Sequence, residues 1–400
     1  MLSLYRGLLG GLLVAGLAAV GASPLGAQAK KDPPKKDAAV VPKKDMKKDD
    51  ARERSVSFAT SDGLALNGYW FQGTAIEKQR PDAVLMFPAP GSKITDAWIN
   101  LARALSEKNF SVLLFDWRGC GLNGPEAGSR IFESPERFWA ETYNQRILGG
   151  RKAAIEDKGL DFKDLVNRGN GNLRYRDWLF NDLVGARYFL DKQSDNGKCN
   201  TNRVWIISEK EGSHMGLAFI ATEFWRDSIY HPRETLLDTN RQTKSAGKDY
   251  AGMMALSYAD SPAAASNVFA NAIPSGNNSP LMKEARTHLE QRLATVLLYS
   301  KKEGASASKA LVNRLRAGGT EDVMKRNFKY LREIDTKTSP VTGLAMLDDM
   351  DSFGARANIV EAMVEISKRQ NFGKDATDRE ANKTTNIPRY QVEMFYRPRN

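Results

Sequence analysis

Cysteine and histidine are scarce in this chain of 400 residues, which contains two cysteines and three histidines. Structural zinc sites need several such ligands at short spacings, and the sequence has neither cysteine pairs nor the metalloprotease pattern H-E-x-x-H. It also lacks the phosphate-binding P-loop pattern. We therefore predict no metal site, no disulfide framework and no cofactor.

Long hydrophobic runs are also missing. The apolar run at residues 8–20 is too short and too rich in glycine to span a membrane comfortably. Arg6 precedes this run, and the small-x-small sequence Ala-Gln-Ala follows it at residues 27–29. This pattern predicts a signal peptide at residues 1–29 and export to the periplasm, cell envelope or medium. An uncleaved anchor is the alternative, and we expect no transmembrane segment in the mature chain.

Large apolar side chains are nearly absent from residues 30–54. Eight lysines and five aspartates lie between residues 30 and 50, and they contribute part of the net charge of +11. This composition predicts a disordered tether, whose basic clusters suit contact with an anionic cell-envelope polymer. Aromatic residues are interspersed as in any core and form no nucleic-acid platform, so we predict no nucleic-acid partner.

Short apolar runs alternate with helical patterns from residue 55 to residue 370. This alternation predicts an α/β domain with a mostly parallel central sheet and helices on both faces. An insert is expected at residues 124–174, after the fourth strand, and a tail at residues 371–400. Cys120 and Cys199 fall at opposite strand ends, which predicts two free thiols. Strands are predicted at 56–59, 66–71, 83–87, 111–116, 203–207, 251–257, 294–299 and 330–334, and helices at 97–108, 175–192, 213–225 and 352–368.

Two loops carry a resemblance to a known superfamily. Residues 116–121 (Asp-Trp-Arg-Gly-Cys-Gly) are similar to the D-x-R-G-x-G turn of the α/β hydrolases, which include esterases, lipases and peptidases. In such enzymes an oxyanion loop follows the corresponding strand. The residues at that place in this chain are Pro88, Ala89, Pro90 and Gly91. The resemblance covers about residues 55–370 and implies an α/β-hydrolase fold.

Residues 119–124 also match the dinucleotide-binding pattern G-x-G-x-x-G. That motif needs a helix to begin at once beneath the pyrophosphate, whereas Pro125 and a polar stretch follow here. We interpret the glycines as a tight turn.

The resemblance implies a nucleophile on a sharp strand-to-helix elbow, G-x-S-x-G. The corresponding residues 208–212 are Ser-Glu-Lys-Glu-Gly, so Lys210 occupies the nucleophile position. A lysine forms no acyl ester, and its ordinary pKa keeps it protonated. Ser213 is expected to cap the following helix.

The other two triad positions follow later strands. Glu303 stands where the acid is expected, and Asp260 is the alternative. In the loop at 335–347, Thr342-Gly343 aligns with the family's His-Gly, so Thr342 occupies the histidine position. None of the histidines, which are His214, His231 and His288, lies in this loop.

Three functional hypotheses remain at this stage. In the first, the protein is catalytically inactive and Lys210, beside the start of the next helix, binds a small anionic ligand; an internal ion pair of Lys210 with Glu303 is the alternative. In the second, Ser208 or Ser213 pairs with Lys210 or His214 in an active esterase or peptidase. The third is a structural component of the cell envelope.

Overall fold

The computed structural model describes residues 52–74, 80–166, 175–224, 246–259, 280–300, 306–315, 329–334, 343, 345–346 and 355–369. All of them belong to the compact unit Asp49–Asn400. The predicted signal peptide, most of the tether and the tail at 371–400 lie outside the described residues. The predicted end of the tether at residue 54 is wrong by two residues, because the first strand begins at Glu53.

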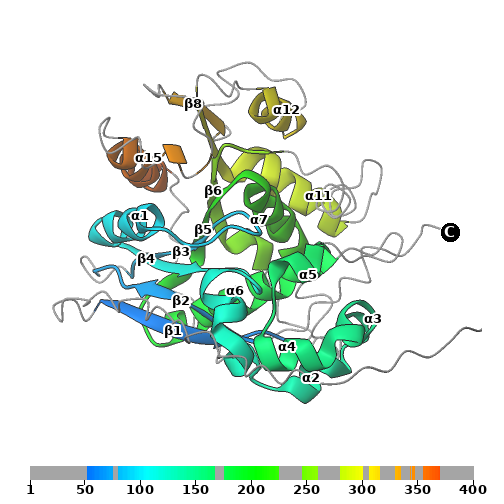
Figure 1. Ribbon diagram of the computed structural model, residues 1–400. Coiled ribbons are helices and arrows are strands. Elements are labelled where there is room, and N and C mark those ends of the chain that lie inside the picture. The colour runs from blue at the N-terminus through cyan, green and yellow to red at the C-terminus, as the bar shows by residue number, and fades with distance from the viewer. Residues whose placement is uncertain are drawn as a thin grey trace, which may run out of the picture. The chain divides into compact units, whose positions relative to one another are not determined.

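The core of the fold is a sheet of eight strands in the order β1-β2-β4-β3-β5-β6-β7-β8 (Figure 1). β2 pairs antiparallel with β1 and β4, and all other pairs are parallel. The interchange of β3 and β4 is the strand order of the α/β-hydrolase fold, so the predicted fold is confirmed. The strands are β1 Glu53–Ala59, β2 Ala65–Phe71, β3 Asp82–Phe87, β4 Phe110–Phe115, β5 Asn200–Glu209, β6 Tyr250–Leu256, β7 Ala294–Ser300 and β8 Lys329–Ile334.

Continuous apolar runs explain why the central strands form where they do. Every residue of β4, β6 and β7 is buried, as expected for strands covered on both faces. α1 (Asp96–Glu107) and α15 (Ala355–Arg369) cover one face of the sheet, and α6 (Phe180–Asp195) and α7 (Lys210–Glu223) cover the other (Figure 1). The prediction of helices on both faces is confirmed.

The insert after β4 is more helical than the sequence pattern suggests. Its described part, up to residue 166, consists of short helices joined by tight turns. They are η1 Gly121–Asn123, η2 Pro125–Ile131, α2 Pro135–Ala140, α3 Thr142–Leu148, η3 Gly149–Arg151, α4 Lys152–Lys158 and α5 Phe162–Val166. The remaining described helices are η4 Tyr175–Leu179, η5 Ala246–Asp249, α11 Pro280–Thr287, the π-helical turn His288–Arg292 and α12 Ser306–Arg314.

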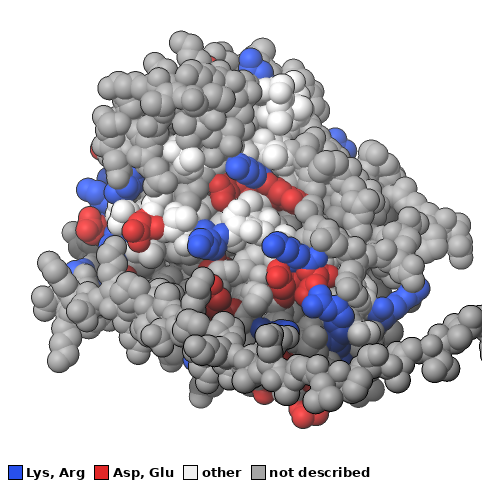
Figure 2. Space-filling model, viewed as in Figure 1, with Lys and Arg blue, Asp and Glu red and all other residues white. Residues whose placement is uncertain are grey.

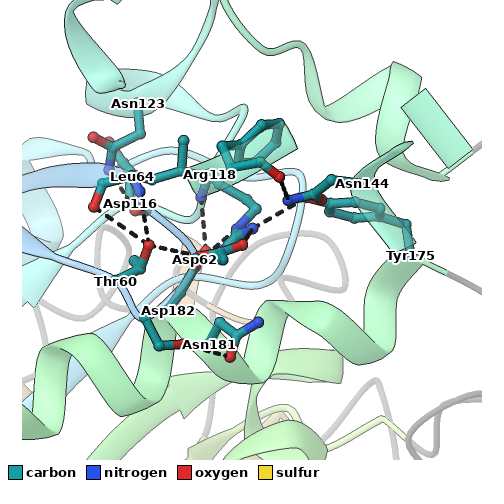
Figure 3. A network of polar contacts seen from close by, with 12 residues as sticks. Thr60, Asp62, Leu64, Asp116, Arg118, Asn123, Asn144, Tyr175, Asn181 and Asp182 are labelled. Carbon is teal, nitrogen blue, oxygen red and sulfur yellow. Dashed lines mark hydrogen bonds and ion pairs between the residues drawn. The ribbon is translucent and has the colours of Figure 1, made fainter. Parts of the chain in front are cut away.

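A buried ion network attaches this insert to the sheet (Figure 3). Arg118, in the turn after β4, forms ion pairs of 2.6 Å with Asp62 of the β1–β2 hairpin and 2.5 Å with Asp182 of α6. Tyr143 of α3 donates its hydroxyl to Asp62 at 2.7 Å. Burial alone would raise the pKa of Asp62, but the adjacent Arg118 guanidinium outweighs it and lowers that pKa. The network therefore joins four separate segments around one cation.

Both cysteines are free and buried, which confirms the prediction of two thiols. Within the part of the chain that the structure describes, no helix combines the length and apolar character needed to cross a membrane.

Candidate functional site at the strand β5 to helix α7 elbow

The turn between β5 and α7 has the geometry of a nucleophile elbow. β5 ends at Glu209, α7 begins at Lys210, and Lys210 has a positive φ of 46°. A long side chain rarely adopts this left-handed conformation, which the elbow imposes on its central residue. Lys210 therefore stands at the tip of the bend between β5 and α7.

The predicted start of the helix at Ser213 is wrong. Glu209 is the N-cap residue, with an extended backbone, and α7 begins three residues earlier than expected. The sharp turn brings the chain into the helix immediately, although the polar sequence Glu-Lys-Glu at residues 209–211 is typical of a loop. Ser213 lies in the first turn instead of at the cap.

Gly212 allows the helix to pack closely against the neighbouring loop. A Cβ atom at Gly212 would lie 2.3 Å from Ser208 Oγ and 3.0 Å from the carbonyl oxygen of Pro88. Any larger side chain at residue 212 would push α7 away from Ser208 and from the loop that contains Pro88. This close contact explains why the elbow motif requires a small residue there.

The described part of the predicted histidine loop lies against the elbow. A Cβ atom at Gly343 would be 2.9 Å from Lys210 Cε and 2.3 Å from Glu209 Oε2. The N–H of Gly343 donates to Ser257 Oγ at 2.7 Å, at the end of β6. Thr342, Glu303 and Asp260 lie outside the described residues, so the structure gives no geometry for these predicted positions.

The loop of residues 88–91 lies beside the elbow. In the parallel register, Phe87 of β3 is opposite Ser208 of β5, the residue before Glu209. The N–H of Ala89 donates to Glu209 Oε1 at 3.3 Å. Pro88 and Pro90 have no N–H group to offer.

Both serines near the elbow donate their hydroxyl groups to backbone carbonyls. Ser208 Oγ donates to Phe87 O, and Ser213 Oγ donates to Ser208 O, each at 2.8 Å. Both residues are fully buried. In this arrangement neither hydroxyl lies at the exposed tip of the bend, where Lys210 is found.

The two described histidines are buried in the core. His214 Nδ1 lies 2.7 Å from the Tyr258 hydroxyl, and His288 Nε2 lies 2.9 Å from the carbonyl oxygen of Tyr250. Burial lowers the pKa of His288 to about 4, so its imidazole is neutral at physiological pH. His231 lies outside the described residues.

The glycine-rich segment after β4 is a tight turn closed by a carboxylate. Asp116 accepts hydrogen bonds from the N–H groups of Ile94 at 2.8 Å and Leu122 at 2.9 Å. Burial raises the pKa of Asp116 to about 6. Gly121 has a φ of 45°, and a Cβ atom there would overlap the Asp116 carboxylate. The interpretation as a turn is therefore confirmed, because the side chain of Asp116 fills the space inside it.

Two contacts near the site were not predicted from the sequence. One is the hydrogen bond between Ala89 and Glu209. The other is the position of α5 in the insert, where the Phe162 ring lies 2.8 Å from the point that a Cβ atom of Gly91 would occupy. Both contacts depend on long-range packing, which the local sequence does not show.

No protein-family model matches the sequence, and no curated protein matches it. Among solved structures, an esterase domain from a Rhodothermus marinus protein is 14% identical, with a TM-score of 0.40 over 79% of this chain and 98% of that chain. A dienelactone hydrolase from Anabaena variabilis is also 14% identical, with a TM-score of 0.37 over 79% and 97%. Esterase B from Lactobacillus rhamnosis is 10% identical, with a TM-score of 0.41 over 82% and 91%. The strand order and the elbow remain the basis of the fold assignment.

Proposed function

We propose that this protein has the fold of an α/β hydrolase without its chemistry and acts as a binding protein. The observation that carries the proposal is Lys210 at the tip of the elbow, with a φ of 46°. A protonated ammonium group has no lone pair with which to attack a carbonyl carbon. The position that forms the covalent intermediate in related enzymes is therefore occupied by a cation.

The environment of the serines supports the same proposal. An active alternative needs Ser208 or Ser213 beside a base, yet each hydroxyl donates to a backbone carbonyl within the core. Thr342 at the expected histidine position would supply no base, because a threonine hydroxyl does not accept a proton at neutral pH. Loss of nucleophile and base together would lower the rate by several orders of magnitude.

We further propose that Lys210 contacts a small anionic group. Its side chain is exposed beside the first turn of α7, where the positive end of the helix dipole favours negative charge. Among the coloured side chains in Figure 2, basic and acidic residues are intermixed.

For the test, the full chain including residues 1–29 is expressed in a bacterial host, and the mature protein is purified. Export predicts that the isolated chain begins at Lys30, which N-terminal sequencing detects. We expect no labelling by a fluorophosphonate probe and no hydrolysis of short-chain esters. Inorganic phosphate should raise the melting temperature, and Lys210→Met should abolish this shift. Lys108→Met, at an exposed lysine after α1, is the matched control.

Labelling of the wild-type protein that disappears in Ser208→Ala or Ser213→Ala would establish the active alternative and overturn the proposal. A phosphate effect that persists in Lys210→Met would overturn the assignment of Lys210 as the anion contact.

A further inference from the structure

Two residues with a left-handed backbone follow neighbouring strands at the same edge of the sheet. In the described part of the chain, the residues other than glycine with a positive φ are Asn109, Lys210 and Ser257, and the φ of Ser257 is 52°. The last residues of β5 and β6, Glu209 and Leu256, are paired in the parallel register. Lys210 and Ser257 are the residues that follow them. Strained conformations of this kind cluster at functional sites, where surrounding contacts hold them in place.

Contacts with two other elements hold the backbone of Ser257. Its N–H donates to the carbonyl oxygen of Leu298 in β7 at 2.8 Å. The hydroxyl of the next residue, Tyr258, lies 2.7 Å from His214 Nδ1 in α7. Ser257 is 1% exposed, so its short side chain lies inside the protein. The bend after β6 is therefore anchored on both sides, and the Ser257 hydroxyl meets the turn at Gly343.

The hydroxyl of Ser257 holds both ends of that turn. It accepts the N–H of Gly343 at 2.7 Å and donates to Met346 Sδ at 3.7 Å. The turn is closed by the N–H of Met346, which donates to the carbonyl oxygen of Gly343 at 3.1 Å. Met346 itself is buried in the core on the α1 and α15 side of the sheet. One side chain thus connects the end of β6 with the turn at residues 343–346.

The turn lies directly against the side chain of Lys210. A Cβ atom at Gly343 would be 2.9 Å from Lys210 Cε, the carbon that carries the ammonium group. The stem of this exposed lysine therefore rests on the backbone of the glycine. A lysine side chain free in solvent has many rotamers, and fixing them when a ligand binds lowers the affinity. Contact with the turn restricts the rotamers of Lys210 before a ligand arrives.

We infer that Ser257 is a positioning residue, whose hydroxyl holds the turn at Gly343 against Lys210 and so pre-orients the ammonium group for an anion. The inference rests on the proposed function, because it takes Lys210 as the anion contact. Ser257 itself touches no ligand. Its effect reaches the anion through Gly343 and the lysine stem, so its loss should weaken binding without removing the charge that binds.

The first experiment measures the affinity for inorganic phosphate by equilibrium dialysis. Ser257→Gly removes the hydroxyl, and because glycine adopts a positive φ without strain, this variant should fold. We expect binding about 5-fold weaker than in the wild-type protein, the factor that corresponds to one net hydrogen bond. The matched control is Asn109→Gly, which relaxes a φ of 70° just before β4 and should leave the affinity unchanged. Equal affinity in Ser257→Gly and the wild-type protein, or an equal loss in Asn109→Gly, would overturn the inference.

A second measurement follows the lysine itself and does not depend on phosphate. Reductive methylation with ¹³C-formaldehyde keeps the charge of each lysine and gives it an NMR signal. The signal of Lys210 is the one missing from Lys210→Met. In Ser257→Gly this signal should narrow and move toward that of a freely mobile lysine, whereas Asn109→Gly should leave it in place.

An unchanged Lys210 signal in Ser257→Gly would overturn the inference. Absence of phosphate binding in the wild-type protein, or its persistence in Lys210→Met, would instead overturn the anion contact of the proposed function. The two failures are therefore distinguishable.

Discussion

At the scale of single residues, His288 couples the stability of the fold to pH. Its pKa is lowered to about 4 by burial, whereas an unfolded histidine titrates near its ordinary pKa of 6.5. Between these values the unfolded chain binds a proton that the folded chain does not. The stabilising contribution is complete above pH 6.5 and is lost as the pH falls toward 4, with a loss of about 2 kcal/mol at pH 5.

The matched variant is His288→Gln, whose amide can donate to the carbonyl oxygen of Tyr250 but does not titrate. Urea unfolding at pH 7.5 and pH 5 should show the wild-type protein losing about 2 kcal/mol more than His288→Gln between the two conditions. Equal losses in both proteins would show that His288 does not titrate in this range on unfolding.

Individual residues of the site also differ in how well the sequence predicts their positions and contacts. The turn at Lys210 can be recognised in the linear sequence because a strand precedes it, and a Gly at residue 212 and a helix follow it. The hydrogen bond between Glu209 and Ala89 was not predicted. The two residues are 120 positions apart, and only the register of β3 against β5 brings them together.

At the scale of secondary-structure elements, the buried hydroxyl of Tyr143 helps to attach α3 to the domain. It donates to Asp62 at 2.7 Å and accepts from Asn181 at 2.9 Å. Tyr143→Phe removes both bonds but keeps the ring, which stacks on Trp178 at a centroid distance of 3.6 Å. We expect a loss of about 1–3 kcal/mol in the free energy of unfolding, because Asp62 loses one of its buried donors.

Hydrogen exchange should locate this effect in the insert, with faster exchange in α2 and α3 than elsewhere in the domain. The control is Tyr188→Phe in α6, where a half-exposed ring lies beneath the Lys192 ammonium group and keeps that contact as phenylalanine. It should change stability by less than about 0.5 kcal/mol. A uniform increase in exchange across the sheet would contradict a local role for Tyr143.

The elements differ in how well the sequence predicted them. The central strands were predicted because burial on both faces gives a continuous apolar run that is visible locally. The helices of the insert were not, because they are as short as the three residues of η3 and depend on distant partners such as Asp62. Short helices gain most of their stability from tertiary contacts, which a local pattern does not encode.

At the scale of the whole molecule, the arrangement of the sheet explains why the two cysteines are not paired. Cys120 follows the carboxyl end of β4, and Cys199 precedes the start of β5, so the sheet separates them. Their exposed fractions are 5% and 0%. Burial raises the pKa of Cys120 to about 12 and also raises that of Cys199, which leaves almost no thiolate to react at neutral pH.

The native protein should therefore react very slowly with Ellman's reagent, whereas protein in concentrated guanidinium chloride should release two equivalents per chain. Cys120→Ala and Cys199→Ala should each reduce the unfolded value to one equivalent. Since reaction requires exposure of both core positions, the rate in the native state should follow unfolding and increase with denaturant. Rapid reaction of one thiol without denaturant, or a mass two daltons lower from an internal disulfide, would contradict this arrangement of the sheet around its cysteines.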